Sequence, residues 1–223
     1  MHHQPARIVL LTGASRGVGA AVAQRLASPD THVVLNYLAH ADRANGVAEA
    51  IRRAGGHAST FAADISDEGG AASMVESIAT RFGRLDALIL NASDGRQWGS
   101  TSSDTRRPTP DAQRHLARLA VPLMPAGGRI VFVTSHQAHF FPFKAVPKGY
   151  SAVAATNRAG ETALYEMRSV FGHAGLHLTV VSGDMIDGTL AADKFAETIV
   201  NVATKPDRRS IVYVGGPECV VAA

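Results

Sequence analysis

The sequence predicts an α/β fold in which a doubly wound, seven-stranded parallel sheet is covered by helices on both faces. Two observations indicate this fold class. Short apolar stretches of strand length alternate along the chain with longer stretches in which apolar residues recur at helical spacing. Most connections between these stretches are short, which favours right-handed crossovers between neighbouring parallel strands.

The first strand and the turn after it organise the rest of the chain. Four consecutive apolar residues in Arg7–Leu11 indicate a buried parallel strand, and helix formers follow at 20–27. Between them lies Thr-Gly-Ala-Ser-Arg-Gly-Val-Gly, residues 12–19. A glycine turn that leads from a strand into a helix N-terminus offers unpaired N–H groups and a positive dipole end to an anion.

The remaining elements follow from the same periodicities. Further strands are expected at 32–37, 57–63, 85–90, 129–134, 176–181 and 210–214, and further helices at 42–54, 68–81, 111–123, 150–171 and 191–204. Long irregular segments are expected at 94–110 and 135–149. The carboxyl ends of the strands are where ligands of such sheets bind.

Composition indicates the class of protein. The chain has 223 residues, 46% hydrophobic and 18% charged, which predicts one globular domain over 1–223 and excludes a disordered chain. The net charge is +3 without a Lys/Arg run, so no nucleic-acid partner is expected. A single cysteine, Cys219, no membrane-length apolar stretch and no hydrophobic signal core at the N-terminus predict a cytoplasmic protein without a membrane partner.

The glycine spacing is Gly-x-x-x-Gly-x-Gly rather than the commoner Gly-x-Gly-x-x-Gly. The stretch at 12–19 resembles the signature of the short-chain dehydrogenase/reductase family, and in particular its 3-oxoacyl reductases. The resemblance extends from Ile8 to Val214. It implies a Rossmann-type fold, a nicotinamide dinucleotide and a small-molecule carbonyl or hydroxyl substrate.

Further cofactor positions are matched residue by residue. In the family, an Asp after the third strand binds the adenine, and Asp64 matches it. An Asn-Ala-Gly run after the fourth strand lines the cofactor. Asn91-Ala92 matches its first two residues, while Ser93 replaces the glycine. Taken alone, Asp64 is equally well a helix cap, and Asn91 a turn residue. The expected cofactor contacts are Gly13, Ser15, Arg16, Gly17, Val18, Gly19, Asn36, Tyr37, Asp64, Ile65, Asn91, Ala92, Ser93, Tyr150, Gly183, Met185 and Ile186.

The end of the second strand favours NADP over NAD. Proteins of this fold that bind NAD hold the ribose 2′-hydroxyl with an acid after the second strand, but Asn36-Tyr37 stands here and the first acid is Asp42. Arg16 lies inside the glycine turn, where its guanidinium matches a 2′-phosphate. Arg43 is a second candidate for the same contact.

The resemblance implies catalysis by Ser135 and Tyr150. The family uses a Ser after the fifth strand, a Tyr at the start of the next long helix and a Lys one turn later. Ser135 and Tyr150 match, but Ala154 replaces the lysine. Substitutes considered for its charge or polarity are Asn157, Arg158, Lys144, Lys148, His136 and His139, and spacing selects none of them.

Two further family positions depart from the pattern. The helix before the fifth strand has no asparagine, and its nearest polar residues are Asp111 and Gln113. After the sixth strand Ser182 replaces the proline of a Pro-Gly pair while Gly183 matches, and Met185 or Ile186 is expected to contact the nicotinamide. A helix follows almost at once, where the family usually has a longer segment that covers the substrate.

Two functions are therefore expected as alternatives. The first is an NADP(H)-dependent oxidoreductase that transfers hydride to a carbonyl or 3-oxoacyl substrate. The second is a catalytically weak or inactive NADP-binding protein that acts as a sensor or assembly partner. No metal site is expected, because His136-Gln137-Ala138-His139 lacks a clear third ligand. The family often pairs through the helices flanking the fifth strand, so a homodimer or homotetramer is expected.

Overall fold

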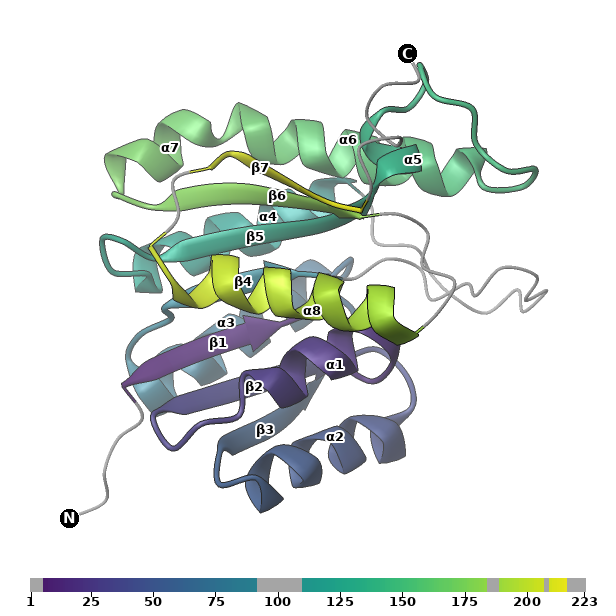
Figure 1. The fold of residues 1–223 in the computed structure, drawn as a ribbon. Helices are drawn as coiled ribbons and strands as arrows, with labels where there is room; N and C mark the ends of the chain where they lie inside the picture. Colours follow the sequence, from purple (N-terminus) through teal and green to yellow (C-terminus); the bar gives the residue numbers. More distant parts are fainter. Residues whose placement is uncertain (1–5, 92–109, 184–188, 207–208, 216–223) are drawn as a thin grey trace.

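The computed structural model describes residues 6–91, 110–183, 189–206 and 209–215. Seven parallel strands form one sheet in the order β3-β2-β1-β4-β5-β6-β7, which confirms the predicted fold class (Figure 1). The strands are β1 (Arg7–Leu11), β2 (Thr31–Tyr37), β3 (His57–Ala62), β4 (Ala87–Leu90), β5 (Arg129–Ser135), β6 (His177–Gly183) and β7 (Ile211–Val214).

Helices cover both faces of the sheet (Figure 1). They are α1 (Gly17–Arg25), α2 (Ala41–Arg53), α3 (Glu68–Phe82), α4 (Pro110–Ala120), α5 (His136–His139), α6 (Ser151–Glu166), α7 (Arg168–His173) and α8 (Thr189–Thr204), with a 3₁₀ turn, η1, at Val121–Leu123. Buried residues of α1, α2 and α8 pack on one face of the sheet, and those of α3, α4, α6 and α7 pack on the other.

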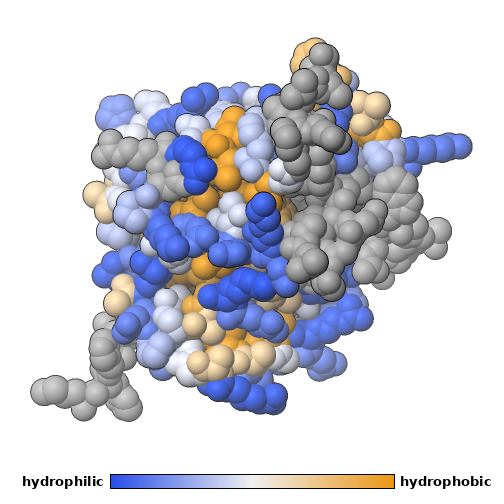
Figure 2. Space-filling model, viewed as in Figure 1, coloured by the Kyte–Doolittle hydropathy of each residue, from blue (hydrophilic) through white to orange (hydrophobic). Residues whose placement is uncertain are grey.

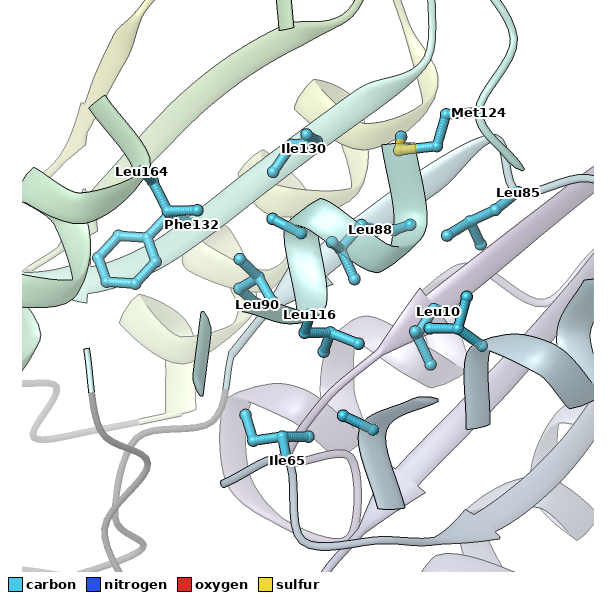
Figure 3. Packing of buried hydrophobic residues seen from close by; sticks show 14 of the residues in the cluster. Leu10, Ile65, Leu85, Leu88, Leu90, Leu116, Met124, Ile130, Phe132 and Leu164 are labelled. Carbon is cyan, nitrogen blue, oxygen red and sulfur yellow. The ribbon is translucent and has the colours of Figure 1, made fainter. Parts of the chain in front are cut away.

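The alternation of side chains along the strands produces two separate hydrophobic clusters. On β5, Ile130 and Phe132 face α4 and α6, while Val131 between them faces α8. Figure 3 shows the first cluster, in which Leu116 of α4 lies among the strand residues Leu88 and Leu90. Each such side chain, when fully buried, contributes about 1.5–3 kcal/mol to folding. Because both faces are buried, the central strands are continuous apolar runs.

The outer surface of the helices is mixed in character. On the face where α1 and α8 lie, hydrophilic side chains alternate with apolar ones (Figure 2). Such a mixture is ordinary, because apolar atoms contribute a large share of the surface of any folded protein. Among the described residues, no helix combines the length and the apolar character that a membrane span requires.

The order of the strands indicates where a ligand would bind. β1 pairs with β2 on one side and with β4 on the other. Strands β1 to β3 are added toward one edge of the sheet and β4 to β7 toward the other, so the order of strands reverses between β1 and β4. The connections leaving the carboxyl ends of these two strands therefore pass to opposite faces of the sheet. In open parallel sheets this reversal point is where nucleotides bind.

Three elements differ from the sequence-based expectation. The helix expected at 111–123 ends at Ala120 and continues as a 3₁₀ turn that contains Pro122, whose ring nitrogen has no hydrogen to donate. The helix expected at 150–171 is two helices, α6 and α7, joined at Met167. The irregular segment expected at 135–149 includes the short helix α5.

Candidate functional site

The three glycines after β1 have different roles. Gly13 and Gly17 have positive φ angles of 64° and 55°, a conformation that side chains with a Cβ rarely adopt. A Cβ on Gly19 would lie 2.2 Å from the Gly13 carbonyl oxygen and 2.7 Å from Asn91 Nδ2. A Cβ on Gly17 would meet nothing within 4 Å. The third glycine thus allows α1 to pack closely on the Gly13 carbonyl and the Asn91 side chain, while a side chain at the second would point into open space.

Asn91 joins the end of β4 to the turn after β1. Its backbone N–H donates to Thr12 Oγ1 at 3.0 Å, and its side-chain amide donates to the Gly13 carbonyl at 3.4 Å. Thr12 Oγ1 in turn lies 3.4 Å from the Ile89 carbonyl. Asn91 therefore holds the two strands at the reversal point in register with the glycine turn.

The N-terminus of α1 is positioned as an anion site. Arg16 is the N-cap residue and is exposed, and no side chain of the described residues caps this helix. Its first turn has no acidic residue that would offset the positive end of the dipole. Ser15 and Val18, beside Arg16, are partly buried. A phosphate is the kind of group that such a helix end attracts.

The end of β2 presents no carboxylate in its described residues, but Asn36 is not free to contact a ligand through its amide group. Asn36 is buried, and its Nδ2 donates to the Ala63 carbonyl at 3.0 Å and to the Phe61 carbonyl at 3.4 Å. The Asn36 carbonyl accepts from the Ala14 N–H at 3.2 Å, which joins β2 to the glycine turn. Tyr37, at the end of the strand, is partly exposed.

Asp64 and Asp67, the two aspartates that follow β3, have different structural roles. Asp64 Oδ1 accepts from the Ser66 N–H at 2.8 Å and so closes a turn. Asp67 caps α3, because its Oδ2 accepts from the Gly70 N–H at 2.8 Å. Asp64 is therefore not the cap of α3. Ile65, between them, is buried in the core.

Ser135 and Tyr150 are in direct contact. Ser135 ends β5 and Tyr150 is the N-cap residue of α6, and the distance from Ser135 Oγ to the Tyr150 hydroxyl is 3.1 Å. Ser135 Oγ also accepts from the Ala138 N–H at 3.1 Å. Both side chains are partly exposed at the carboxyl edge of the sheet. Gly183 of β6 pairs with Ser135 in the sheet, so it borders the same place.

The residues that could replace the family's lysine, absent at Ala154, lie in different surroundings. Ala154 is fully buried, and Asn157 is also buried on α6. His136 Nδ1 lies 2.8 Å from Ser182 Oγ, and Arg158 donates to Glu161 at 2.9 Å. Lys144 is partly exposed and Lys148 is exposed. None of the hydrogen bonds described for these residues reaches the Tyr150 hydroxyl.

Glu161, on α6, belongs to a buried network that sequence reasoning missed. Its carboxylate contacts Arg158 and His139, and His139 also contacts the hydroxyl of Tyr213 on β7. Burial first, and then the Glu161 charge, raise the pKa of the Tyr213 phenol. The only signal in the sequence is the Arg158–Glu161 spacing of one helical turn, which usually indicates a surface ion pair.

Four predicted cofactor contacts, Ala92, Ser93, Met185 and Ile186, lie outside the described residues. Within the described part of the chain, no group of three or more His, Cys, Asp or Glu side chains is arranged to hold a metal ion. The described site therefore consists of the glycine turn with Arg16, the ends of β2 and β4, and the Ser135–Tyr150 pair.

Curated relatives of this chain include reductases. The 1-cyclohexenylcarbonyl-CoA reductase of Streptomyces collinus is 30% identical over 187 residues, which cover 81% of this chain and 65% of the relative. Elsinochrome reductase 1 of Elsinoe fawcettii is 32% identical, and the match covers 70% of this chain and 59% of the relative. The chain thus spans less than two thirds of the length of these relatives.

Solved structures share the fold over nearly the whole chain. A short chain dehydrogenase from Burkholderia cenocepacia in complex with NADP has a TM-score of 0.77 at 27% identity, covering 96% of this chain and 97% of that one. The reductase LugOII of lugdunomycin biosynthesis has a TM-score of 0.79 at 24% identity, covering 99% and 100%, which shows the common fold. The family model of short chain dehydrogenases matches residues 7–157. This match spans more than half of the chain, and the protein belongs to the short-chain dehydrogenase/reductase family.

Proposed function

We propose that this protein is an NADP(H)-dependent reductase that transfers hydride to the carbonyl group of a small molecule, with 3-oxoacyl compounds as one candidate class. The observation that supports this most strongly is the 3.1 Å contact between Ser135 Oγ and the Tyr150 hydroxyl. It places a proton donor and a second hydroxyl side by side at the edge of the sheet where this family binds its cofactor.

The residues of the glycine turn fit a dinucleotide. The positive φ angles of Gly13 and Gly17, the open space above Gly17 and the uncapped N-terminus of α1 are what the pyrophosphate of such a cofactor requires. Asp64 and Ile65 would border the adenine, and Asn91 and Gly183 would border the nicotinamide half. When bound, the cofactor supplies the hydride, which no side chain can provide.

Two features favour the phosphorylated cofactor. Arg16 is exposed at the N-terminus of α1, where its guanidinium suits a 2′-phosphate. At the end of β2, the Asn36 amide is engaged with β3, and no acid stands there to accept the ribose 2′-hydroxyl. Tyr37 is then the β2 residue that would contact the ribose. The Burkholderia cenocepacia protein, which shares the fold at 27% identity, was solved with NADP.

We assign separate roles to the two hydroxyls. Ser135 Oγ accepts the Ala138 N–H, which fixes the oxygen and leaves its own hydrogen to donate to a carbonyl oxygen. Tyr150 donates its proton to the oxygen as hydride reaches the carbon. Reduction needs a phenol that still holds its proton, whereas oxidation of an alcohol needs a nearby cation that helps the phenol to lose it. The absence of a lysine at position 154 is therefore compatible with reduction.

A set of carbonyl substrates tests this proposal through the oxidation of NADPH. Wild-type protein is expected to oxidise NADPH in the presence of at least one carbonyl, while Tyr150→Phe loses about 10²–10⁴-fold in rate because the proton donor is gone. In Arg16→Ala, the dissociation constant for NADPH rises by about tenfold or more while that for NADH changes little, as expected for one lost charged contact. Equal effects on both cofactors would contradict the role of Arg16.

Ala154 supports a second candidate function. The buried Ala154 supplies no charge to lower the pKa of a phenol or to hold a ribose. A protein of this fold that binds NADPH without turnover would act as a sensor or an assembly partner. Binding of NADPH with no turnover of any carbonyl would favour this function over the reductase.

We further propose that the chain acts as one domain in the cytoplasm and pairs with a second copy through α4 and α6. A groove between these helices is lined by Arg114, Arg158, Thr162 and Glu166 among other residues. Light scattering of the purified protein tests this: a dimer or tetramer is expected, and a monomer at high concentration would contradict it.

A further inference from the structure

Glu161 is a buried carboxylate with two partners. Its side chain has no exposed surface, and an ionised carboxylate in such a place is costly unless it is paired and hydrogen-bonded. Arg158, one turn earlier on α6, donates to Oε1 at 2.9 Å, and the side chain of Arg158 is partly exposed. His139 lies with its Nδ1 2.9 Å from Oε2 and is itself buried. The guanidinium supplies the balancing charge, so His139 is not required to be protonated.

These contacts fix the tautomer of His139. An ionised carboxylate only accepts hydrogen bonds, so the hydrogen must be on Nδ1. In the neutral ring, Nε2 then accepts from the hydroxyl of Tyr213, which lies 3.0 Å away on β7. The ring of Phe140 stacks on that of Tyr213, with 5.8 Å between centroids. One side chain at the end of α5 is thus bound to α6 and to β7 at once.

His139 is the last residue of α5, and Ser135 is the N-cap residue of the same helix. α5 has four residues, too few to be stable by its own hydrogen bonds. At its start, the Ala138 N–H donates to Ser135 Oγ, the atom that contacts Tyr150. At its end, His139 is held by Glu161 of α6, and Tyr150 is the N-cap residue of that same helix. The two elements that supply the Ser135–Tyr150 pair are therefore joined a second time, through buried atoms.

We propose that Glu161 and His139 are positioning residues, which keep Ser135 Oγ at hydrogen-bond distance from the Tyr150 hydroxyl by fixing α5 against α6. This inference rests on the reductase function proposed above and adds to it two residues that touch neither substrate nor cofactor. The hydrogen bond that matters is the one from His139 Nδ1 to Glu161, since it joins α5 to α6. The bond from Tyr213 to Nε2 joins α5 to β7, which supplies no reacting side chain.

Two substitutions of His139 separate these bonds. The amide nitrogen of asparagine replaces Nδ1, so His139→Asn retains the donor to Glu161 and loses the contact with Tyr213. The longer glutamine places its amide near Nε2, so His139→Gln retains the contact with Tyr213 and loses the donor to Glu161. Tyr213→Phe removes only the hydrogen bond between the Tyr213 hydroxyl and His139 Nε2. Glu161→Gln weakens the contact between Glu161 and His139, and Glu76→Gln, an exposed change on α3, is its matched control.

Steady-state kinetics and amide exchange are both measured on these variants. His139→Gln and Glu161→Gln are expected to lower kcat by about 10–100-fold, because a small displacement of reacting groups has a large effect on rate. Their KM for NADPH stays within about twofold, since most of the proposed NADPH contacts lie at the glycine turn and after β2, β3 and β4. Exchange of the Ala138 N–H accelerates by about tenfold or more. His139→Asn, Tyr213→Phe and Glu76→Gln are expected to remain close to wild type in kcat and in exchange.

Equal kcat values for His139→Asn and His139→Gln, whether both normal or both reduced, would overturn the proposal and leave the network a purely structural one. If His139→Gln does not fold, amide exchange of the wild-type protein is the test. The proposal then requires the Ala138 N–H to exchange only through global unfolding. Exchange by local opening overturns the proposal. Failure of the reductase function is seen separately: none of the carbonyl substrates then makes the wild-type protein oxidise NADPH. In that case, the exchange comparison still shows whether Glu161 fixes α5.

Discussion

Gly19→Ala tests the packing that shapes the glycine turn. The added Cβ would lie 2.2 Å from the Gly13 carbonyl oxygen and 2.7 Å from Asn91 Nδ2, both closer than real contacts allow. The Gly13 oxygen belongs to the backbone, so relief requires α1 to move or the turn to open. Overpacking of this kind costs about 1–3 kcal/mol. Loss of the Asn91 contact with Gly13 adds about 1 kcal/mol, while the better helix propensity of alanine returns about the same.

We therefore expect Gly19→Ala to be about 1–3 kcal/mol less stable in urea denaturation and to bind NADPH at least about tenfold more weakly. Gly46→Ala is the matched control, because Gly46 is exposed on α2 and an added Cβ meets nothing within 4 Å. That change is expected to stabilise the protein by about 0.5–1 kcal/mol without affecting NADPH binding. Equal stability and NADPH affinity in the two variants would refute the close packing of α1 on Gly13 and Asn91.

Three further predictions concern stability. Phe132→Ala removes a large side chain that is 1% exposed between the sheet, α4 and α6, and is expected to cost about 3–5 kcal/mol in urea denaturation; a cost below about 1 kcal/mol would contradict its place in the core. Asp67→Ala removes the cap of α3 and is expected to cost about 1 kcal/mol, whereas Asp67→Asn retains most of it. Burial first, and then Arg81, lower the pKa of His32 from 6.5 to about 4. Between these values the unfolded chain takes up a proton that the folded protein does not, so stability decreases by up to about 3 kcal/mol as the pH is lowered from about 6.5 to about 4. His32→Phe should remove this part of the pH dependence, and an unchanged slope would show that another group causes it.

The fold was predictable because both of its periodicities are strong. Buried strands such as Arg7–Leu11 and β5 are continuous apolar runs, and α2 has its buried residues at helical spacing, so local patterns and the fold agree. The glycine turn was equally clear. Two of its glycines have positive φ angles, and the third has no room for a Cβ, so the sequence pattern reflects steric requirements of the backbone.

The details that sequence reasoning missed depend on contacts between distant residues. α5 forms because Ser135 caps it and because His139 forms a hydrogen bond with Glu161, which is 22 positions away in the sequence. No local pattern reports such a contact. The junction of α6 and α7 at Met167 has no glycine or proline to mark it, and the core residues Leu164 and Phe171 lie on either side of it.

The candidate site was predicted as a set of residues but not as a set of contacts. The spacing between Ser135 and Tyr150 identified a pair that the structure brings to 3.1 Å. Asn36 was expected to contact the cofactor, yet its amide is turned to β3, because a buried amide at a strand end takes the nearest free carbonyls. Asp64 was ambiguous between a ligand and a cap, and only the position of Asp67 shows which residue caps α3.

Transfer of deuterium from labelled NADPH to a carbonyl substrate, followed by mass spectrometry of the product, tests the proposed chemistry most directly. It detects hydride transfer even when turnover is slow. We expect one deuterium in the alcohol formed by wild-type protein, and a loss of labelled product of about 10²-fold or more in Tyr150→Phe. Protein that binds NADPH but labels no carbonyl, or labels it equally well without the Tyr150 hydroxyl, would contradict the assignment of Ser135 and Tyr150 as a reducing pair.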